Sequence, residues 1–235
     1  MSRIVWDQTG DRRYETGVKN CVLYLLDNSG AYSNGVAWNG ITSISESPSG
    51  ADANDFYADD MKYLTLRGAE TFGGTIEAYT FPDEWAICDG SAELVPGVML
   101  GQQTRKPFGL CYRTVVGNDV ANDAFGYKLH IVYNSTASPS ERSYETINDS
   151  PEPINFSWEF TSTPINVTGH KAVSCITIDS TKVASDKMTS LENVLYGTEN
   201  TDPRLPLPDE LATLLSTSTT TETTTETTTE TTTEP

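Results

Sequence analysis

The chain has 235 residues, enough for one large all-β domain or two small ones with a real hydrophobic core. Its 33 acidic and 15 basic side chains give a formal net charge of −18. A surface with this charge repels phosphate groups, which argues against sequence-specific binding to DNA or RNA.

Two further features of the sequence predict the cellular compartment of the protein and the oxidation state of its cysteines. The start of the chain lacks the apolar core of an export signal, and no stretch is apolar and long enough to cross a membrane. We therefore expect folding in a cytosol and no membrane partner. The four cysteines are widely spaced and include no Cys-x-x-Cys pair, so they are expected to be buried free thiols.

Residues 1–17 are expected to form an N-terminal arm, with Trp6 and Tyr14 as its only large anchors. Ordering against a neighbour and simple fraying are equally compatible with this pattern. The segment 18–26 is apolar at both alternating positions, which predicts a strand buried on both faces. A further strand is expected near 36–45, and it leads into the next segment.

The segment between Glu46 and Glu70 has no sustained apolar alternation, which predicts a long irregular loop between two strands. It mixes aspartates with large apolar side chains. Because such side chains on an exposed segment leave hydrophobic surface in water, we expect another protein surface to cover them. The predicted contact residues of this docking loop are Phe56, Tyr57, Asp59, Asp60, Met61 and Tyr63.

The chain is expected to return as a strand over 72–79, because Phe72, Gly74, Ile76 and Ala78 share one face. A short helix is predicted over 82–88. Its first turn contains proline and two acids, Gly90 stands at its end, and Trp85 is its expected core anchor. Residues 91–106 contain proline and glycines and are predicted to be a loop.

Four more strands are predicted after residue 106. The segments 108–116 and 126–134 flank a turn-rich connection, as in a hairpin. The strongest alternation lies in 154–161, where Trp158 is on the apolar side, so one face should be buried and the other polar. A short strand is expected over 173–179.

Two short helices are expected near the end of the domain assigned to residues 18–200. The segment from Thr189 to Glu192 matches a capping box, which predicts a helix that begins there and ends before Gly197. A proline-rich segment over 201–215 should end in a short helix. Residues 216–235 contain four Thr-Thr-Thr-Glu repeats, which cannot form a core and are expected to be disordered. An O-glycosylated stalk is the alternative for this tail.

The sequence contains no recognisable active site. The acidic segments do not match the spacing of a calcium loop, and His130 and His170 lack metal-ligand company, so polar surface roles are expected for both. Hydrolase, nucleotide and dinucleotide motifs are absent. We therefore predict no catalytic residue, no metal and no cofactor. A secreted carbohydrate-binding or adhesin β-sandwich is the alternative function, and a glycosidase is a third, although both are disfavoured without an export signal.

Several short motifs, in order and spacing, are similar to those of one protein family. They are Phe56–Asp60, Tyr63, Gly73–Glu77, Pro82–Trp85 and Lys106–Thr114. Together they resemble the major tail (tail tube) proteins of long-tailed bacteriophages of Gram-positive hosts, over roughly residues 16–197.

The resemblance implies an all-β, sandwich or barrel-like tail-tube fold with one or two short helices. It also implies a structural virion protein rather than an enzyme, assembled in the host cytoplasm into stacked, hexameric rings. The implied partners are further copies of the chain and the tape-measure, tail terminator and distal tail proteins. DNA would pass through the lumen without specific binding.

Two glutamates are candidate lumen-facing residues. Glu46 and Glu77 lie on the two predicted strands that flank the docking loop, on faces with few large apolar groups. A wall of carboxylates repels DNA phosphates at short range, over a screening length of about 8–10 Å.

Overall fold

The computed structural model describes residues 3–50, 52–147, 149 and 151–216. Apart from Ser216, the Thr/Glu tail predicted to be disordered lies outside the described residues. The elements follow the chain in this order: β1 (Arg13–Leu26), β2 (Tyr32–Trp38), β3 (Ile41–Glu46), β4 (Ser49–Gly50), β5 (Ala53–Ala58), β6 (Met61–Arg67), β7 (Glu70–Ala78), η1 (Asp83–Trp85), α1 (Ala86–Asp89), β8 (Ala92–Val95), β9 (Val98–Leu100), β10 (Phe108–Asn118), β11 (Asn122–Ala137), β12 (Phe156–Ser162), β13 (Cys175–Asp179), α2 (Ser185–Tyr196) and α3 (Pro208–Leu215).

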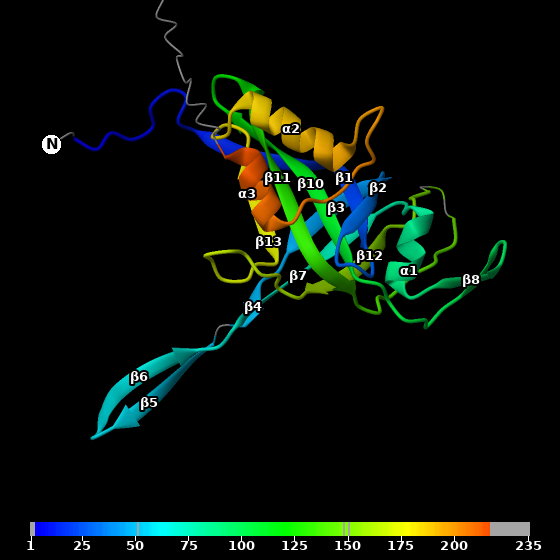
Figure 1. The fold of residues 1–235 in the computed structure, drawn as a ribbon, viewed down its shortest axis with the longest axis horizontal. Coiled ribbons are helices and arrows are strands. Elements are labelled where there is room, and N and C mark those ends of the chain that lie inside the picture. Colours follow the sequence, from blue (N-terminus) through cyan, green and yellow to red (C-terminus); the bar gives the residue numbers. More distant parts are fainter. Residues whose placement is uncertain (1–2, 51, 148, 150, 217–235) are drawn as a thin grey trace, which may run out of the picture.

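Most strands belong to one antiparallel sheet in the order β2-β1-β10-β11-β12-β7-β3, with β13 paired to β11 and β4 paired to β7. Two hairpins, β5–β6 and β8–β9, stand apart from this sheet and project from the body of the molecule (Figure 1). The predicted all-β fold with a few short helices is confirmed.

The long strands bend where single residues take left-handed backbone angles. Asn134 in β11 has a φ of 47° and lies between the part of β11 that pairs with β13 and the part that pairs with β12. Gly17 and Asn20 in β1, with φ of 70° and 53°, coincide with two register shifts against β10. Bulges of this kind increase strand twist, so one sheet can curl over its own core.

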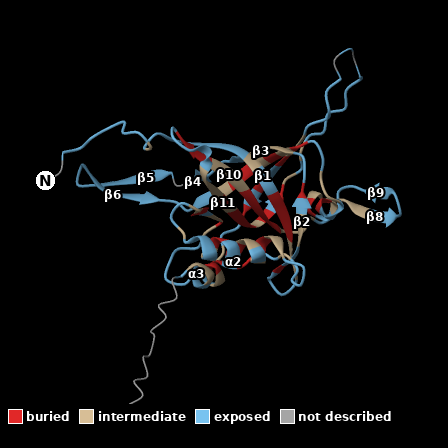
Figure 2. Ribbon diagram, turned by 90° about the horizontal axis from the view of Figure 1, so that it is seen from above, coloured by how far each residue is buried: buried red, intermediate tan, exposed pale blue. Residues whose placement is uncertain are grey.

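The part of the sheet formed by β1, β10 and β11 is buried on both faces, and successive residues of β1 show this. Leu23 belongs to a core between the β1–β10 part of the sheet and the β12–β7–β3 part. Tyr24 belongs to a second core, under α2 and α3, which cover the other face of the sheet (Figure 2). The predicted burial of this strand on both faces is confirmed, although β1 begins at Arg13 rather than at residue 18.

Two tryptophans occupy their predicted places in the first core. Trp158 in β12 and Trp85 at the end of η1 are both buried, and their ring centroids lie 5.6 Å apart. Trp38 lies 4.6 Å from Trp85 and donates its indole N–H to the carbonyl of Thr80 over 2.8 Å. Gly90 ends α1 with a φ of 81°, as expected for a glycine at this position.

Three further sequence-based assignments are wrong. The strand expected near 36–45 is two strands, because Gly40, with a φ of 78°, separates β2 from β3. The capping box is not used: α2 begins at Ser185, and the Thr189 hydroxyl instead donates to the Ser185 carbonyl inside the helix. The loop expected over 91–106 contains the β8–β9 hairpin.

Candidate assembly surfaces

The predicted docking loop is a β-hairpin rather than an irregular loop. β5 and β6 pair antiparallel around Asp59 and Asp60, which have φ values of 52° and 58°. Two consecutive residues with positive φ between paired strands form a type I′ turn, whose twist suits a two-residue hairpin. At its base, β4 pairs with β7, so the hairpin extends the edge of the main sheet.

The hairpin is amphipathic. In the register of β5 and β6, Phe56 faces Leu64 and Asn54 faces Leu66, so these side chains share one face. Phe56 is 49% exposed and Leu66 is 56% exposed. The face defined by Phe56, Leu64 and Leu66 is called the hairpin apolar face below.

The other face of the hairpin is polar. Asp55 contacts the Lys62 ammonium over 2.8 Å and accepts a hydrogen bond from the Thr65 hydroxyl over 2.7 Å. The hydrogen bonds from Lys62 and then Thr65 lower the pKa of Asp55. Tyr57 is paired with Lys62 on this side, because successive residues of a strand point to opposite faces.

All six predicted contact residues lie on this hairpin. Asp59 and Asp60 form the turn, and Met61 and Tyr63 are more than two-thirds exposed beside it. Phe56 and Tyr57, however, point to opposite faces. Leu64 and Leu66 were not among the predicted contact residues, although their period-two spacing is the signal of a strand with one apolar face.

A second surface is the outer face of β12, β7 and β3. The strand register places side chains from the three strands next to one another in rows. One row is Ser157, Glu77 and Ser43, and the next is Glu159, Thr75 and Ser45. These side chains are half-buried or exposed. We call this set the polar face; its members are Ser43, Ser45, Thr75, Glu77, Ser157, Glu159 and Thr161.

The two candidate lumen residues do not share a face. Glu77 lies on the polar face, where the Ser43 hydroxyl donates to it over 2.9 Å. Glu46 pairs with Gly74, two positions along from the pair of half-buried Ile44 and buried Ile76, and so points toward the core side of the sheet. One surface therefore cannot carry both carboxylates, and the prediction that pairs them is corrected.

Glu46 belongs instead to a polar cluster at the end of the first core. Tyr112 donates its hydroxyl to Glu46 over 2.6 Å, and the His130 Nδ1 lies 3.7 Å from the same carboxylate. His130 stacks on Tyr112 with ring centroids 4.8 Å apart. Contact with His130, and then the Tyr112 hydrogen bond, hold the pKa of Glu46 below its ordinary value despite partial burial.

Glu15 continues this cluster onto β1. Its carboxylate lies 3.2 Å from the His130 Nε2, accepts the Thr114 hydroxyl over 2.6 Å and pairs with Lys128. Burial raises the pKa of Glu15, but the hydrogen bonds from Lys128 and Thr114 lower it overall. His130 thus links β1, β3, β10 and β11, rather than serving as a lone surface side chain.

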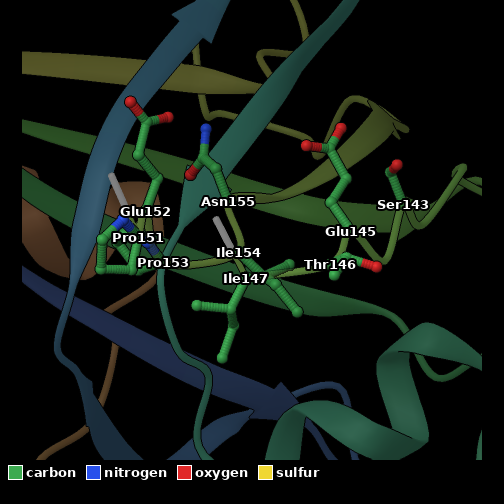
Figure 3. Close-up of a pocket in the computed structure, with 9 residues that line it drawn as sticks. All are labelled: Ser143, Glu145, Thr146, Ile147, Pro151, Glu152, Pro153, Ile154 and Asn155. Carbon is green, nitrogen blue, oxygen red and sulfur yellow. The ribbon is translucent and has the colours of Figure 1, made fainter. Parts of the chain in front are cut away.

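A cavity of about 450 Å³ lies within the loop after β11, between residues 143 and 155 (Figure 3). Its described lining has hydroxyl groups and two carboxylates but no histidine, cysteine or lysine to activate a nucleophile.

Among the described residues, no group of three or more His, Cys, Asp or Glu side chains could hold a metal ion. No described helix combines the length and the hydropathy of a membrane span.

No protein-family model matches the chain, and no curated protein matches it. Among solved structures, the chain is similar to the sheath-tube complex of an extracellular contractile injection system in its extended state, with a TM-score of 0.35 and 14% identity over 68% of this chain and 88% of that chain. It is also similar to the sheath/tube terminator of such a system, with a TM-score of 0.33 and 13% identity over 70% of this chain and 97% of the other.

A third similar structure is the tube-terminating cap of the anti-feeding prophage, with a TM-score of 0.32 and 12% identity over 77% of this chain and 97% of that chain. These structures come from a sheath-tube complex, a sheath/tube terminator and a tube-terminating cap. Their TM-scores are too low to carry a functional argument for this chain.

Proposed function

We propose that this chain is a structural subunit that assembles into stacked rings, forming the tube of a bacteriophage tail. The observation that carries the proposal is the projecting β5–β6 hairpin. The side chains of its apolar face are between 37% and 56% exposed. They lie on an arm that no described element covers. Burying such a face against a second copy removes apolar surface from water, at roughly 25 cal/mol per Å².

Unpaired strand edges support assembly within a ring. β3 is the last strand of the sheet, and no described strand pairs with its outer edge. The first half of β1 is paired only with β10, because its ladder with β2 begins at Cys21. Open N–H and C=O groups favour strand addition, so neighbouring subunits could complete each other's sheets into one continuous barrel.

The polar face suits the inside of such a barrel. It carries hydroxyl groups and the carboxylates of Glu77 and Glu159, and its register rows contain no large apolar side chain. A DNA duplex passing a wall of hydroxyls and carboxylates meets no cation to hold its phosphates. Glu77 is therefore kept as a candidate lumen residue, whereas Glu46 is assigned to the polar cluster.

The finer features of the proposal come from the resemblance of the motifs at Phe56–Asp60, Gly73–Glu77 and Pro82–Trp85 to tail tube proteins. This resemblance implies a tail of a phage of Gram-positive hosts, hexameric rings, assembly in the host cytoplasm, and contact with tape-measure, tail terminator and distal tail proteins. A tube subunit of this kind has no catalytic residue and no cofactor.

Electron microscopy of the purified protein tests the proposal. Stacked rings or tubes are expected above a threshold protein concentration, with a central channel that stain can enter. Image classification gives the number of subunits per ring. A protein that stays monomeric at all concentrations, or that forms only closed dimers, would contradict the proposed function.

A further inference from the structure

The β8–β9 hairpin carries an exposed apolar face that the proposed function does not use. Its strands turn at Pro96 and Gly97, where Gly97 has a φ of 84°. Ala92 pairs with Leu100 and Val95 pairs with Val98, so these side chains share one face. Val95 is 53% exposed, Val98 46% and Leu100 41%. Glu93 and Met99 face the other way.

Backbone hydrogen bonds hold the root of the β8–β9 hairpin, and no described strand covers the rest of it. The backbone N–H of Gln103 donates to the Gly90 carbonyl over 2.9 Å, and that of Lys106 donates to the Ile87 carbonyl over 3.0 Å. β8 and β9 pair only with each other among the described strands, so both outer edges are free. An exposed apolar face with free edges is a typical protein-interaction surface.

The two projecting hairpins lie at opposite ends of the molecule. β5–β6 precedes the start of β7, whereas α1 and then β8–β9 follow its end. Nine residues of β7, at about 3.3 Å each, separate them by about 30 Å. Figure 2 shows β5–β6 and β8–β9 at the two ends of the long axis.

We propose that the apolar face of β8–β9 binds the hairpin apolar face of β5–β6 on a second copy of this chain. The inference rests on the proposed stacking of copies. A head-to-tail stack buries both ends of every internal copy, so the surfaces at the two ends must complement each other. Both hairpins present large apolar side chains on one face, among them Phe56, Leu64 and Leu66 on one and Val95, Val98 and Leu100 on the other.

Charge supports the same pairing. When two hairpins from opposite ends overlap, the tip of each meets the root of the other. The tip of β5–β6 is acidic, with Asp59 and Asp60, and the root of β8–β9 is followed by Arg105 and Lys106. Neither cation forms an ion pair with another described residue, and both are half-buried at the root of the hairpin, where an acidic tip would complement them.

Adjacent residues of β9 provide a matched pair of variants. Val98→Asp places a charge on the apolar face, and Met99→Asp places the same charge on the opposite face, at 51% exposure. We expect Val98→Asp to raise the concentration at which tubes appear by at least about tenfold, or about 1.4 kcal/mol. Met99→Asp should leave that concentration nearly unchanged. Both variants should melt like the wild type, because neither residue is in a core.

Cross-linking identifies the partner surface directly. Protein carrying Leu66→Cys is mixed with protein carrying Val98→Cys and treated with a short bismaleimide, with the wild type as a control for the native thiols. A cross-linked dimer that forms strongly only in the mixture is expected. Cross-linking of Val98→Cys to itself, or no dimer in the mixture, would overturn the inference.

The two proposals fail in different ways. If the wild type forms no tubes by electron microscopy, the proposed function fails, and the mixed cross-link still decides the hairpin contact. If the wild type forms tubes and Val98→Asp forms them at the same concentration, the hairpin contact fails alone.

Discussion

Glu46 and Glu77 lie on opposite faces of the antiparallel pair formed by β3 and β7. Glu77 shares its face with Ser43 and Thr75, whereas Glu46 shares the core side with Ile44 and Ile76. The two carboxylates therefore have different roles, even though both strands flank the same hairpin. Glu77 is available to a surface such as a lumen, and Glu46 is engaged by Tyr112 and His130.

Glu77→Lys should make assembled tubes retain DNA. A lysine on the polar face places a cation where the proposed lumen meets phosphates, and neutralised phosphates add affinity that falls with salt. Retention of linear duplex DNA by the tubes is measured at several salt concentrations. Glu84→Lys, an equal charge change at an exposed residue of η1, is the control. Equal retention by the two variants at low salt would contradict a lumenal position for Glu77.

Trp158→Ala should destabilise the fold by about 3–5 kcal/mol, because it leaves a cavity in the first core. Trp158 is fully packed between Trp38, Trp85 and Phe81. Chemical denaturation followed by fluorescence measures the free energy of unfolding. Trp6→Ala removes an exposed indole from the N-terminal arm and should change stability little. A Trp158→Ala protein as stable as the wild type would be inconsistent with this packing.

The sequence predicts the fold best where hydrophobic alternation is strong. β12 and β7 alternate regularly, so their buried faces and Trp158 are predicted correctly. β1 is apolar at both alternating positions, which correctly indicates burial on two faces. In these segments, the local pattern and the tertiary packing favour the same structure.

The two projecting hairpins were not predicted, because neither of them has a face that is buried in a core. In β5–β6 the turn is Asp59-Asp60, which lacks the glycine that usually marks a two-residue turn. In β8–β9 a bulge at Leu94 interrupts the alternation. The polar cluster was missed for another reason: Glu15, Glu46 and His130 are far apart in sequence, and only the sheet register brings them together.

Phe56→Ser and Tyr57→Ser should have unequal effects on assembly. Phe56 lies on the hairpin apolar face, and Tyr57 lies beside Lys62 on the polar face. Phe56→Ser should leave a folded monomer that does not form tubes, since it removes the largest side chain of that face. Tyr57→Ser should assemble at nearly the wild-type concentration. Sedimentation velocity measures the oligomers, and circular dichroism confirms that both variants fold. Normal tubes from Phe56→Ser would exclude this face from the interface.

The polar cluster around His130 should make stability depend on pH in the acidic range. The pKa values of Glu46 and Glu15 are lowered from 4.5 in the folded protein, so their carboxylates bind protons more weakly there than in the unfolded chain. Their contribution is therefore fully present above pH 4.5 and is lost as the pH falls through the lowered values.

Glu46→Gln tests this dependence by removing the charge while keeping an acceptor for the Tyr112 hydroxyl. Above pH 4.5 the variant should be less stable than the wild type, by less than about 1 kcal/mol because the cluster is partly exposed and screened. As the pH falls, the wild-type carboxylate becomes neutral, so the two melting temperatures should converge. Glu84→Gln, at an exposed site outside the cluster, serves as the control. A constant difference in melting temperature between Glu46→Gln and the wild type across the acidic range would show that the carboxylate charge of Glu46 does not stabilise the fold.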